Sequence, residues 1–322
     1  MLLASLALIV GLIVLMWSAD HFVNSSAATA RNFGMSPMLI GLTIVAIGTS
    51  APEFLVSLIA ALNGLGDIAV GNAVGSNIAN IGIILGLTLV IAPIRVNPRL
   101  MSKELPLLAG VTIISGAVLY DNLINFLDGI LLISGMVLTT VLIYHWQKKP
   151  NDPALSSIGE EEEAEIPDMK QGKATLILVG SLLLLVVSSR VLVWSATTIA
   201  QYFGVSELTI GLTVVAVGTS LPELAASVAS ALKKHPDIAL GNIVGSNIFN
   251  LLTVMAVPGL VGDSTISPSA FTRDYPVMCA MTTLLMVLVF AGKKPRILGR
   301  ISGITLCAAY IAYTAWLLFT AS

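Results

Sequence analysis

Charged side chains are scarce in this sequence. Only 11% of its 322 residues are Asp, Glu, Lys or Arg, whereas soluble domains carry about a quarter. Hydrophobic residues make up 56% of the chain, and the mean hydropathy is +0.93. The composition excludes an ordinary soluble domain and predicts a membrane protein that crosses the bilayer many times.

Cysteine and histidine are also rare. The two cysteines, Cys279 and Cys307, lie in apolar segments, so we expect small buried side chains and no disulfide framework. The three histidines lie near the ends of apolar segments and lack the spacing of a metal site. The chain begins Met-Leu-Leu-Ala-Ser-Leu without a basic stretch, which argues against a cleaved signal peptide.

Ten apolar runs have the length of a helix that crosses a bilayer, about 20 residues. The runs are continuous rather than alternating, which predicts an all-α protein with ten transmembrane helices. The fourth and the ninth are the shortest. The expected spans are residues 2–23, 37–61, 68–92, 105–120, 124–146, 174–198, 206–232, 238–260, 276–291 and 301–319.

Two polar motifs interrupt this apolar background, and each occurs twice. The stretch Gly41-Leu-Thr-Ile-Val-Ala-Ile-Gly-Thr-Ser-Ala-Pro-Glu53 recurs as Gly211-Leu-Thr-Val-Val-Ala-Val-Gly-Thr-Ser-Leu-Pro-Glu223. Asp67-Ile-Ala-Val-Gly-Asn-Ala-Val-Gly-Ser-Asn-Ile-Ala-Asn80 recurs as Asp237-Ile-Ala-Leu-Gly-Asn-Ile-Val-Gly-Ser-Asn-Ile-Phe-Asn250, and both pairs differ by 170 in residue number. A carboxylate near the middle of a membrane helix costs about 2.5–3.5 kcal/mol, so the two glutamates mark a functional site.

The repeat predicts the organisation of the chain. Each half contains five spans, an odd number, so the second half enters the membrane from the opposite side and the halves form inverted-topology repeats. We expect a first five-helix repeat over residues 1–147 and a second over 174–322. Residues 148–173 contain the acidic run Glu160–Glu163 and several prolines, which is typical of a solvated cytoplasmic linker.

The basic residues predict the orientation. If both termini face outside, the inside loops hold 14 of the 16 lysines and arginines, as the positive-inside rule requires. Arg273 lies in an outside loop, and Arg190 lies within the sixth span at the place that corresponds to Asp20 in the first. The sequence assigns no role to Asp20 or Arg190. Asp67 and Asp237 begin their spans, and the simplest interpretation is that they cap helices.

The prolines of the first motif predict two broken helices. In mid-helix, Pro52 removes a backbone donor and displaces the carbonyl four residues earlier, that of Gly48, so that carbonyls near Ala46 and Gly48 can face a cavity. Pro222 does the same for Ala216 and Gly218. A packing kink is the alternative, but two kinks at equivalent positions, each followed by a glutamate, favour a site.

Helical spacing places the polar groups on common faces. Thr49 and Glu53 are four residues apart, as are Asn72, Ser76 and Asn80. We expect Gly71-xxx-Gly75 and Gly241-xxx-Gly245 to let these helices approach the glutamate-bearing ones. The predicted site consists of Glu53, Glu223, Thr49, Thr219, Ser50, Ser220, Ser76, Ser246, Asn80 and Asn250, with freed carbonyls.

This set contains oxygen donors only, without sulfur or histidine, and so suits hard cations such as Ca²⁺. Two glutamates would balance one Ca²⁺ or two Na⁺, and the neutral oxygens could hold a third Na⁺. Competition between these loadings is a sufficient basis for antiport. For a further set of polar residues, a place in the site and a simple interhelical hydrogen bond both stay open: Asn72, Asn77, Asn242, Asn247, Ser57 and Ser227.

The motifs GTSxPE and GNxxGSNIxN, present twice and inverted, resemble the alpha repeats of the calcium/cation antiporter superfamily. Over its whole length the chain is similar to bacterial sodium/calcium exchangers of the YrbG type. The resemblance implies the ten-helix sodium/calcium exchanger fold and sodium-driven exchange of Ca²⁺. It also implies a ligand for the transported cations at each matching position: Glu53 and Glu223 at the centre, Thr49, Ser50, Thr219 and Ser220 beside them, Ser76 and Ser246 as sodium-site serines, and the carbonyls of Ala46 and Ala216.

One position departs from many relatives. They carry aspartate at one of the positions matched by Asn80 and Asn250, whereas both are asparagine here. The cavity therefore has two acidic groups rather than three, and potassium dependence is not expected.

The leading hypothesis is a secondary antiporter that exports Ca²⁺ against Na⁺ by moving a gating pair, the first and sixth spans, over a fixed site. Exchange driven by H⁺ is the alternative, because two close glutamates can also bind protons. An intramembrane enzyme is not expected, because the sequence lacks HExxH and GxSxG. A channel suits inverted repeats with broken helices less well.

The partners expected from these observations are the lipid bilayer and the transported Na⁺ and Ca²⁺. We expect no organic cofactor and no nucleic acid, and a monomer is sufficient for transport. The expected location is a bacterial inner membrane, crossed many times, with both termini on the periplasmic side.

Overall fold

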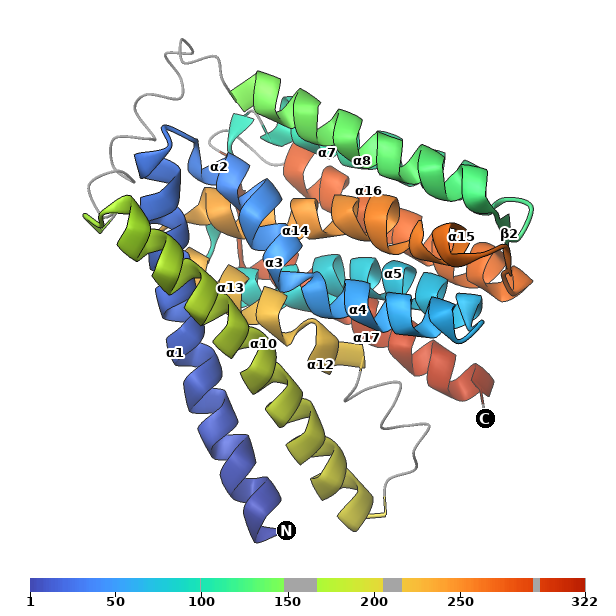
Figure 1. Ribbon diagram of the computed structural model, residues 1–322, viewed down its shortest axis with the longest axis horizontal. Coiled ribbons are helices and arrows are strands. Elements are labelled where there is room, and N and C mark those ends of the chain that lie inside the picture. The colour runs from blue at the N-terminus through green and yellow to red at the C-terminus, as the bar shows by residue number, and fades with distance from the viewer. Residues whose placement is uncertain (99, 148–166, 205–215, 292–295, 322) are drawn as a thin grey trace.

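The computed structural model describes residues 1–98, 100–147, 167–204, 216–291 and 296–321, and these residues are almost entirely helical (Figure 1). The first half contains α1 (Leu2–Asn32), α2 (Pro37–Ile40), η1 (Gly41–Val45), α3 (Ala46–Thr49), α4 (Ala51–Leu62), α5 (Gly66–Ala79), η2 (Asn80–Leu85), α6 (Gly86–Ile91), β1 (Ile94–Arg95), η3 (Leu100–Glu104), α7 (Leu105–Leu119), β2 (Leu123–Ile124) and α8 (Phe126–Gln147), where η marks π-helical segments.

The second half repeats this order. It contains α10 (Gln171–Tyr202), α12 (Ala216–Thr219), α13 (Leu221–Leu232), α14 (Pro236–Phe249), η5 (Asn250–Val254), α15 (Val257–Val261), β3 (Ser264–Thr265), η6 (Ala270–Asp274), α16 (Tyr275–Phe290), β4 (Ile297–Leu298) and α17 (Arg300–Ala321). The expected linker run Glu160–Glu163 lies outside the described residues.

The described residues contain eight continuous helices that are long and apolar enough to cross a membrane, and a ninth span if the bent pair Pro37–Thr49 and Ala51–Leu62 is counted. The remaining expected span, 206–232, begins outside the described residues, and only α12 and α13 are seen of it. The two short spans are longer than expected, Leu100–Leu119 and Ala270–Phe290, because a π-helical turn precedes each.

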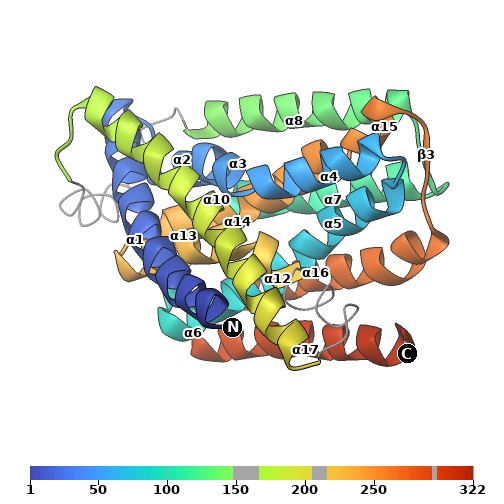
Figure 2. The same cartoon turned by 60° about the horizontal axis from the view of Figure 1, so that its bottom comes forward.

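Two helices are much longer than a bilayer requires. α1 has 31 residues and α10 has 32, which at 1.5 Å per residue gives about 47 Å against a hydrocarbon thickness of about 30 Å. Helices of this length tilt strongly in a membrane. Accordingly, α1 and α10 lie side by side and cross the other helices obliquely (Figures 1 and 2).

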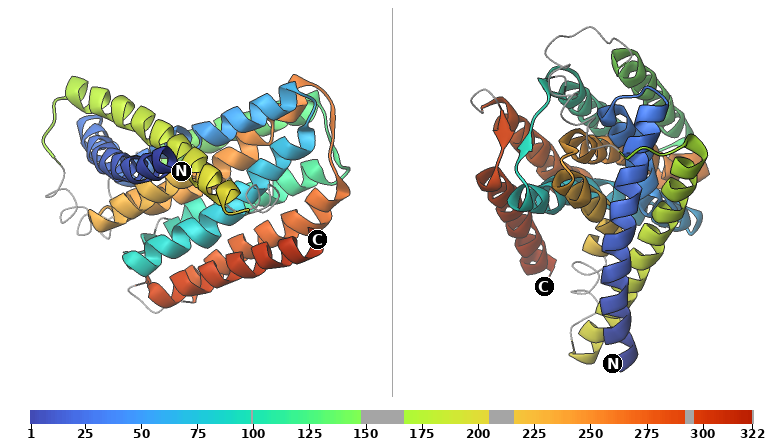
Figure 3. Two further views of the ribbon diagram at one scale, coloured as in Figure 1. Left: turned by 90° about the horizontal axis from the view of Figure 1, so that it is seen from below. Right: turned by 90° about the vertical axis from the view of Figure 1, so that its left-hand side faces the viewer.

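Two small antiparallel sheets join the halves of the chain. β1 pairs with β4 through Ile94↔Leu298, and β2 pairs with β3 through Leu123↔Thr265. The span formed by η3 and α7 connects β1 to β2, so the sheets lie at opposite ends of the helices (Figure 3). We call these ends the β1–β4 face and the β2–β3 face. Each sheet takes one strand from each half, as inverted repeats require.

The two glutamate-bearing helices are broken one residue after the threonine of the motif. Ser50 has φ −83° and ψ 7°, and Ser220 has φ −93° and ψ 11°. Pro52 and Pro222 therefore lie in the first turn of a new helix, where the missing N–H has no partner to lose. The expectation of a proline in mid-helix is wrong, and the break bends the first pair by 45°.

Other polar residues also differ from expectation. Asp67 and Asp237 lie in the first turn of α5 and α14, but neither caps its helix. Asp67 instead accepts from the Ser267 N–H, and Asp237 accepts from Asn97 Nδ2 at 3.0 Å. Each aspartate thus joins the start of one helix to a segment of the other half.

Asp20 and Arg190, which share equivalent positions, differ in their surroundings. Asp20 lies 2.6 Å from Lys233 Nζ in an ion pair that joins α1 to the end of α13. Arg190 is exposed on α10. The cysteines, expected to be buried, are free and only half-buried.

The glycine pairs pack differently in the two halves. A Cβ added at Gly245 would lie 2.5 Å from the Leu42 carbonyl oxygen and 2.7 Å from Ala46 Cβ, and Gly241 touches the backbone of Met38, Gly41 and Leu42. The expected close approach is therefore present at this pair. At Gly71 and Gly75, by contrast, no described residue lies within 4 Å of an added Cβ.

The close contact at Gly245 predicts that a side chain is not tolerated there. Gly245→Ala forces α14 away from η1 and α3, so we expect a loss of about 1–3 kcal/mol in the free energy of unfolding. The loss is expected to appear as a lower temperature at which the monodisperse fraction on size-exclusion chromatography falls after heating in detergent. Unchanged thermal stability would contradict the packing described here.

Candidate cation site

The helix breaks place both glutamates at the start of a helix. Glu53 lies in the first turn of α4 and Glu223 in the first turn of α13, where the helix dipole favours negative charge. Each is only 1% exposed. Two acidic side chains are therefore buried inside the bundle.

Hydrogen bonds cross between the two halves at these glutamates. Ser50 Oγ donates to Glu223 Oε1 at 2.8 Å, and Ser220 Oγ donates to Glu53 Oε1 at 3.2 Å. Each serine lies three residues before the glutamate of its own half. The two carboxylates therefore meet at the pseudo-two-fold axis, each held by a hydroxyl of the other half.

A network of asparagines lies on the two following helices. Asn80 Nδ2 donates to Asn247 Oδ1, and Asn250 Nδ2 donates to Asn77 Oδ1, both at 3.1 Å. All four are at most 2% exposed. Asn80 and Asn250 begin the π-helical segments η2 and η5, a local widening that is common at functional sites. The network fixes which way each amide points.

Several oxygens of the predicted set are buried and have no hydrogen-bond partner among the described residues. They are Glu53 Oε2, Glu223 Oε2, Asn80 Oδ1, Asn250 Oδ1 and Ser246 Oγ. Such atoms are rare, because nearly all buried polar groups in proteins are paired. Carboxylate, amide and hydroxyl oxygens are the ligands that Na⁺ and Ca²⁺ prefer. The donor set therefore fits a hard cation. In the part of the chain that is described, no group of three His, Cys, Asp or Glu side chains is placed to hold a metal ion, here or elsewhere.

Four of the polar residues that could either belong to the site or form interhelical hydrogen bonds connect neighbouring helices. Asn72 Nδ2 donates to the Glu53 carbonyl at 2.9 Å and to Ser57 Oγ at 3.0 Å. In the second half, Asn242 Nδ2 donates to Ser227 Oγ at 3.0 Å. These four side chains make the interhelical hydrogen bonds of the simpler interpretation.

The described structure differs from expectation at the backbone carbonyls. The Ala46 carbonyl accepts from the Ser50 N–H at 3.0 Å and from Thr49 Oγ1 at 3.4 Å, so it is not loosened, because the helix break comes after it. Ala216 begins α12, and only its backbone is described. The Gly218 carbonyl accepts from Ser189 Oγ of α10 at 2.9 Å.

Ser189 is not among the residues predicted from the sequence. A signal was present, because Ser188, Ser189 and Arg190 form a polar triplet inside an otherwise apolar span. The role of Asn77 and Asn247 in orienting their neighbours also needed coordinates.

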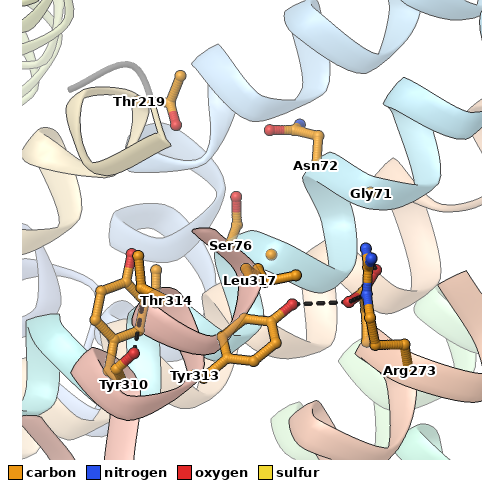
Figure 4. A pocket seen from close by; sticks show the side chains of 12 residues that line it. Gly71, Asn72, Ser76, Thr219, Arg273, Tyr310, Tyr313, Thr314 and Leu317 are labelled. Atoms are coloured by element: carbon orange, nitrogen blue, oxygen red, sulfur yellow. Dashed lines mark hydrogen bonds and ion pairs between the residues drawn. The ribbon is translucent and has the colours of Figure 1, made fainter. Parts of the chain in front are cut away.

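The remaining threonines and serines lie around the glutamates. Thr49 Oγ1 donates to Asn242 Oδ1 at 3.1 Å. Ser76 and Thr219 line a pocket of about 280 Å³ that is enclosed by residues of α5, α12, η6 and α17. Their side chains, with that of Asn72, border the same space (Figure 4). The pocket lies towards the β2–β3 face, because its lining residues come from the first half of the span Gly66–Ile91, the start of the ninth span and the second half of α17.

Comparison with known proteins identifies the family. The pattern of the family described as sodium/calcium exchanger protein matches residues 3–145 and 173–319. The chain belongs to this family. The exchanger family transports ions, so the chain is a cation antiporter of the Ca²⁺-exchanging kind.

Individual relatives agree over the full length. The chain is 46% identical to CaxA of Alkalimonas amylolytica, with 99% of this chain and 100% of the relative covered. It is 42% identical to the inner membrane protein YrbG of Escherichia coli, with 98% and 97% covered. Its structure matches that of the sodium-calcium exchanger NCX_Mj with a TM-score of 0.82 at 32% identity, covering 98% and 99%. The expected exchanger fold with inverted repeats is confirmed.

The asparagine network gives a test of the site. Asn77→Ala and Asn247→Ala leave the amides of Asn250 and Asn80 free to turn, so we expect cation binding to weaken by about tenfold or more. The measurement is the Ca²⁺ concentration that raises the melting temperature half-maximally. Asn63→Ala is the control, because its amide bonds only the Ile59 carbonyl at an exposed helix end. An unchanged Ca²⁺ dependence in both variants would contradict the orienting role.

Proposed function

We propose that this protein exchanges Na⁺ for Ca²⁺ by alternating access around a central site formed by Glu53 and Glu223. The observation that carries the proposal is the pair of cross-bonded glutamates, each with one buried oxygen that has no donor among the described residues. A cation between the halves would bind both. The relative NCX_Mj is named as a sodium-calcium exchanger, which supports the same ions here.

The charge of the site accounts for competition between the ions. Two carboxylates carry −2, which one Ca²⁺ or two Na⁺ neutralise. The uncharged oxygens of Ser76, Ser246, Asn80 and Asn250 can hold a further Na⁺ without another negative charge. Since Ca²⁺ takes six to eight oxygens at about 2.3–2.6 Å, it would draw on the same atoms. One site then cannot hold both loadings, and binding of one ion releases the other.

Further ligands in the proposal are Thr49, Thr219, Ser50 and Ser220, with the carbonyls of Ala46 and Ala216. The Ala46 carbonyl would keep the bond from the Ser50 N–H and bind a cation in place of the long bond from Thr49 Oγ1. Asn80 and Asn250 are both neutral amides, so the site has no third acid and we propose no requirement for K⁺.

Access to the site from the β2–β3 face is supported by the pocket that reaches Ser76 and Thr219. Alternating access is supported by the inverted repeats, because an exchange of conformation between the two halves would open the site to the opposite face.

The location follows from charge and from a relative. The loops that the sequence assigns to the same side as β1 and β4 hold 14 of the 16 lysines and arginines, so we propose that the β1–β4 face is cytoplasmic and that both termini are periplasmic. The relative YrbG is named as an inner membrane protein, and we propose the bacterial inner membrane for this chain. Residues 1–147 and 174–322 are its two repeats, 148–173 is the linker, and one copy suffices for transport.

A ⁴⁵Ca²⁺ flux assay tests which ions the protein exchanges. Purified protein in liposomes loaded with Na⁺ is expected to take up ⁴⁵Ca²⁺, and the uptake should vanish when Li⁺, K⁺ or choline replaces internal Na⁺. Uptake that follows a pH gradient without Na⁺ would favour the alternative, H⁺-coupled exchange.

The site is tested by charge removal. Glu53→Gln or Glu223→Gln keeps the shape but leaves a single negative charge for a divalent ion, so we expect loss of ⁴⁵Ca²⁺ uptake by 100-fold or more, on the order of one ion–carboxylate contact in a dry site. Asp128→Asn is the matched control, because this carboxylate accepts only from the Asn125 N–H at the start of α8. Normal flux in either glutamine variant would reject the assignment.

A further inference from the structure

The pocket that reaches Ser76 and Thr219 has an ion pair in its wall. Arg273 Nε donates to Asp274 Oδ1 at 2.7 Å, and Arg273 Nη2 donates to Asp274 Oδ2 at 3.0 Å. Tyr313 Oη donates to Asp274 Oδ1 at 2.9 Å (Figure 4). The carboxylate of Asp274 is therefore held by two partners, from its own segment and from α17.

The pair contains all the charge that lines this pocket among the described residues. The other lining side chains are hydroxyls, an amide and apolar groups. The Arg273 side chain is 39% exposed and that of Asp274 is 20% exposed. The charges of the guanidinium and the carboxylate therefore cancel among the described residues that line the pocket.

If cations pass through the pocket, the positive charge of Arg273 would repel them unless that charge is neutralised. A divalent cation about 8 Å from an unneutralised positive charge in water is disfavoured by about fivefold. The pocket is only about 280 Å³ in volume, so any cation inside it lies at about this distance from the Arg273 guanidinium or closer. Bidentate pairing is the geometry that neutralises a guanidinium most completely.

We propose that Asp274 keeps this pocket passable for cations by neutralising Arg273, with Tyr313 holding the carboxylate in place. The pocket is then the route by which transported cations approach Ser76 and Thr219 from the β2–β3 face, and Asp274 sets the affinity measured from that face. This inference rests on the proposed function, since it concerns approach to the same site.

The test is a series of variants with different pocket charge. Asp274→Asn leaves a net +1, the wild type and the double variant Arg273→Gln/Asp274→Asn are neutral, and Arg273→Gln leaves −1. The half-saturating Ca²⁺ concentration for exchange is measured from each side in right-side-out and inside-out vesicles. A cysteine placed at Asp121 in the turn before β2, in a background without Cys279 and Cys307, identifies by impermeant maleimide which vesicles expose the β2–β3 face.

On the β2–β3 face we expect the half-saturating Ca²⁺ concentration to rise about fivefold in Asp274→Asn. It should return to the wild-type value in the double variant and fall below that value in Arg273→Gln. The differences should shrink when choline chloride is raised, because salt shortens the Debye length. Measured from the opposite face, the half-saturating Ca²⁺ concentration should be the same for all four proteins.

Two results would overturn the inference: both single variants raising the concentration alike, or identical values for all four on the β2–β3 face. The first result would indicate that the pair serves packing only. If the wild type itself shows no Ca²⁺ exchange in these vesicles, the proposed function fails instead, so the two failures are distinguishable.

Discussion

The structure depends on the way in which two buried carboxylates are held by the opposite halves of the chain. A buried carboxylate is costly unless donors and opposite charge compensate it. Here Ser50 and Ser220 each supply one donor across the pseudo-two-fold axis, and the second oxygen of each glutamate has no donor in the described part. The protein compensates these charges only in part. The uncompensated negative charge is what a bound cation would neutralise in the proposed site.

Irregular backbone makes this arrangement possible. The break at Ser50 begins a new helix, so Glu53 lies in the first turn of α4, where the helix dipole favours its negative charge. The π-helical segments that begin at Asn80 and Asn250 widen the neighbouring helices at the same depth. Irregular backbone at membrane depth is tolerated where it lines a site. The deviations from ideal geometry therefore gather where the candidate ligands lie.

Much of this could be predicted from the sequence, because the two motifs repeat and a glutamate in an apolar span is costly. The repeat located Glu53 and Glu223, the inversion and most spans, since hydropathy and spacing determine these. Other features depend on three-dimensional contacts. Pro52 predicted a kink, but the helix ended two residues earlier, at a serine without a distinctive local signal. The partner of Asp67 is a backbone N–H 200 residues away, and the pairing of Asp20 with Lys233 depends on how α1 crosses α13.

The contacts of the glycine pairs also needed coordinates. Gly245 is in close contact with η1 and α3, and Gly75 lines a pocket. The spacing of the glycines predicts that helices approach each other closely, but it does not identify the segment that each glycine meets.

The two strand pairs have a mechanical consequence. Because β1 binds β4 at one surface and β2 binds β3 at the other, the halves are fastened together at both surfaces, and neither can swing away from the other as a rigid block. α1 and α10 contribute no strand to either fastening, and they contact each other along their length. The two sheets therefore hold the remaining spans together without tying down this tilted pair, whose contacts with the rest of the bundle are made through side chains such as the Asp20–Lys233 ion pair.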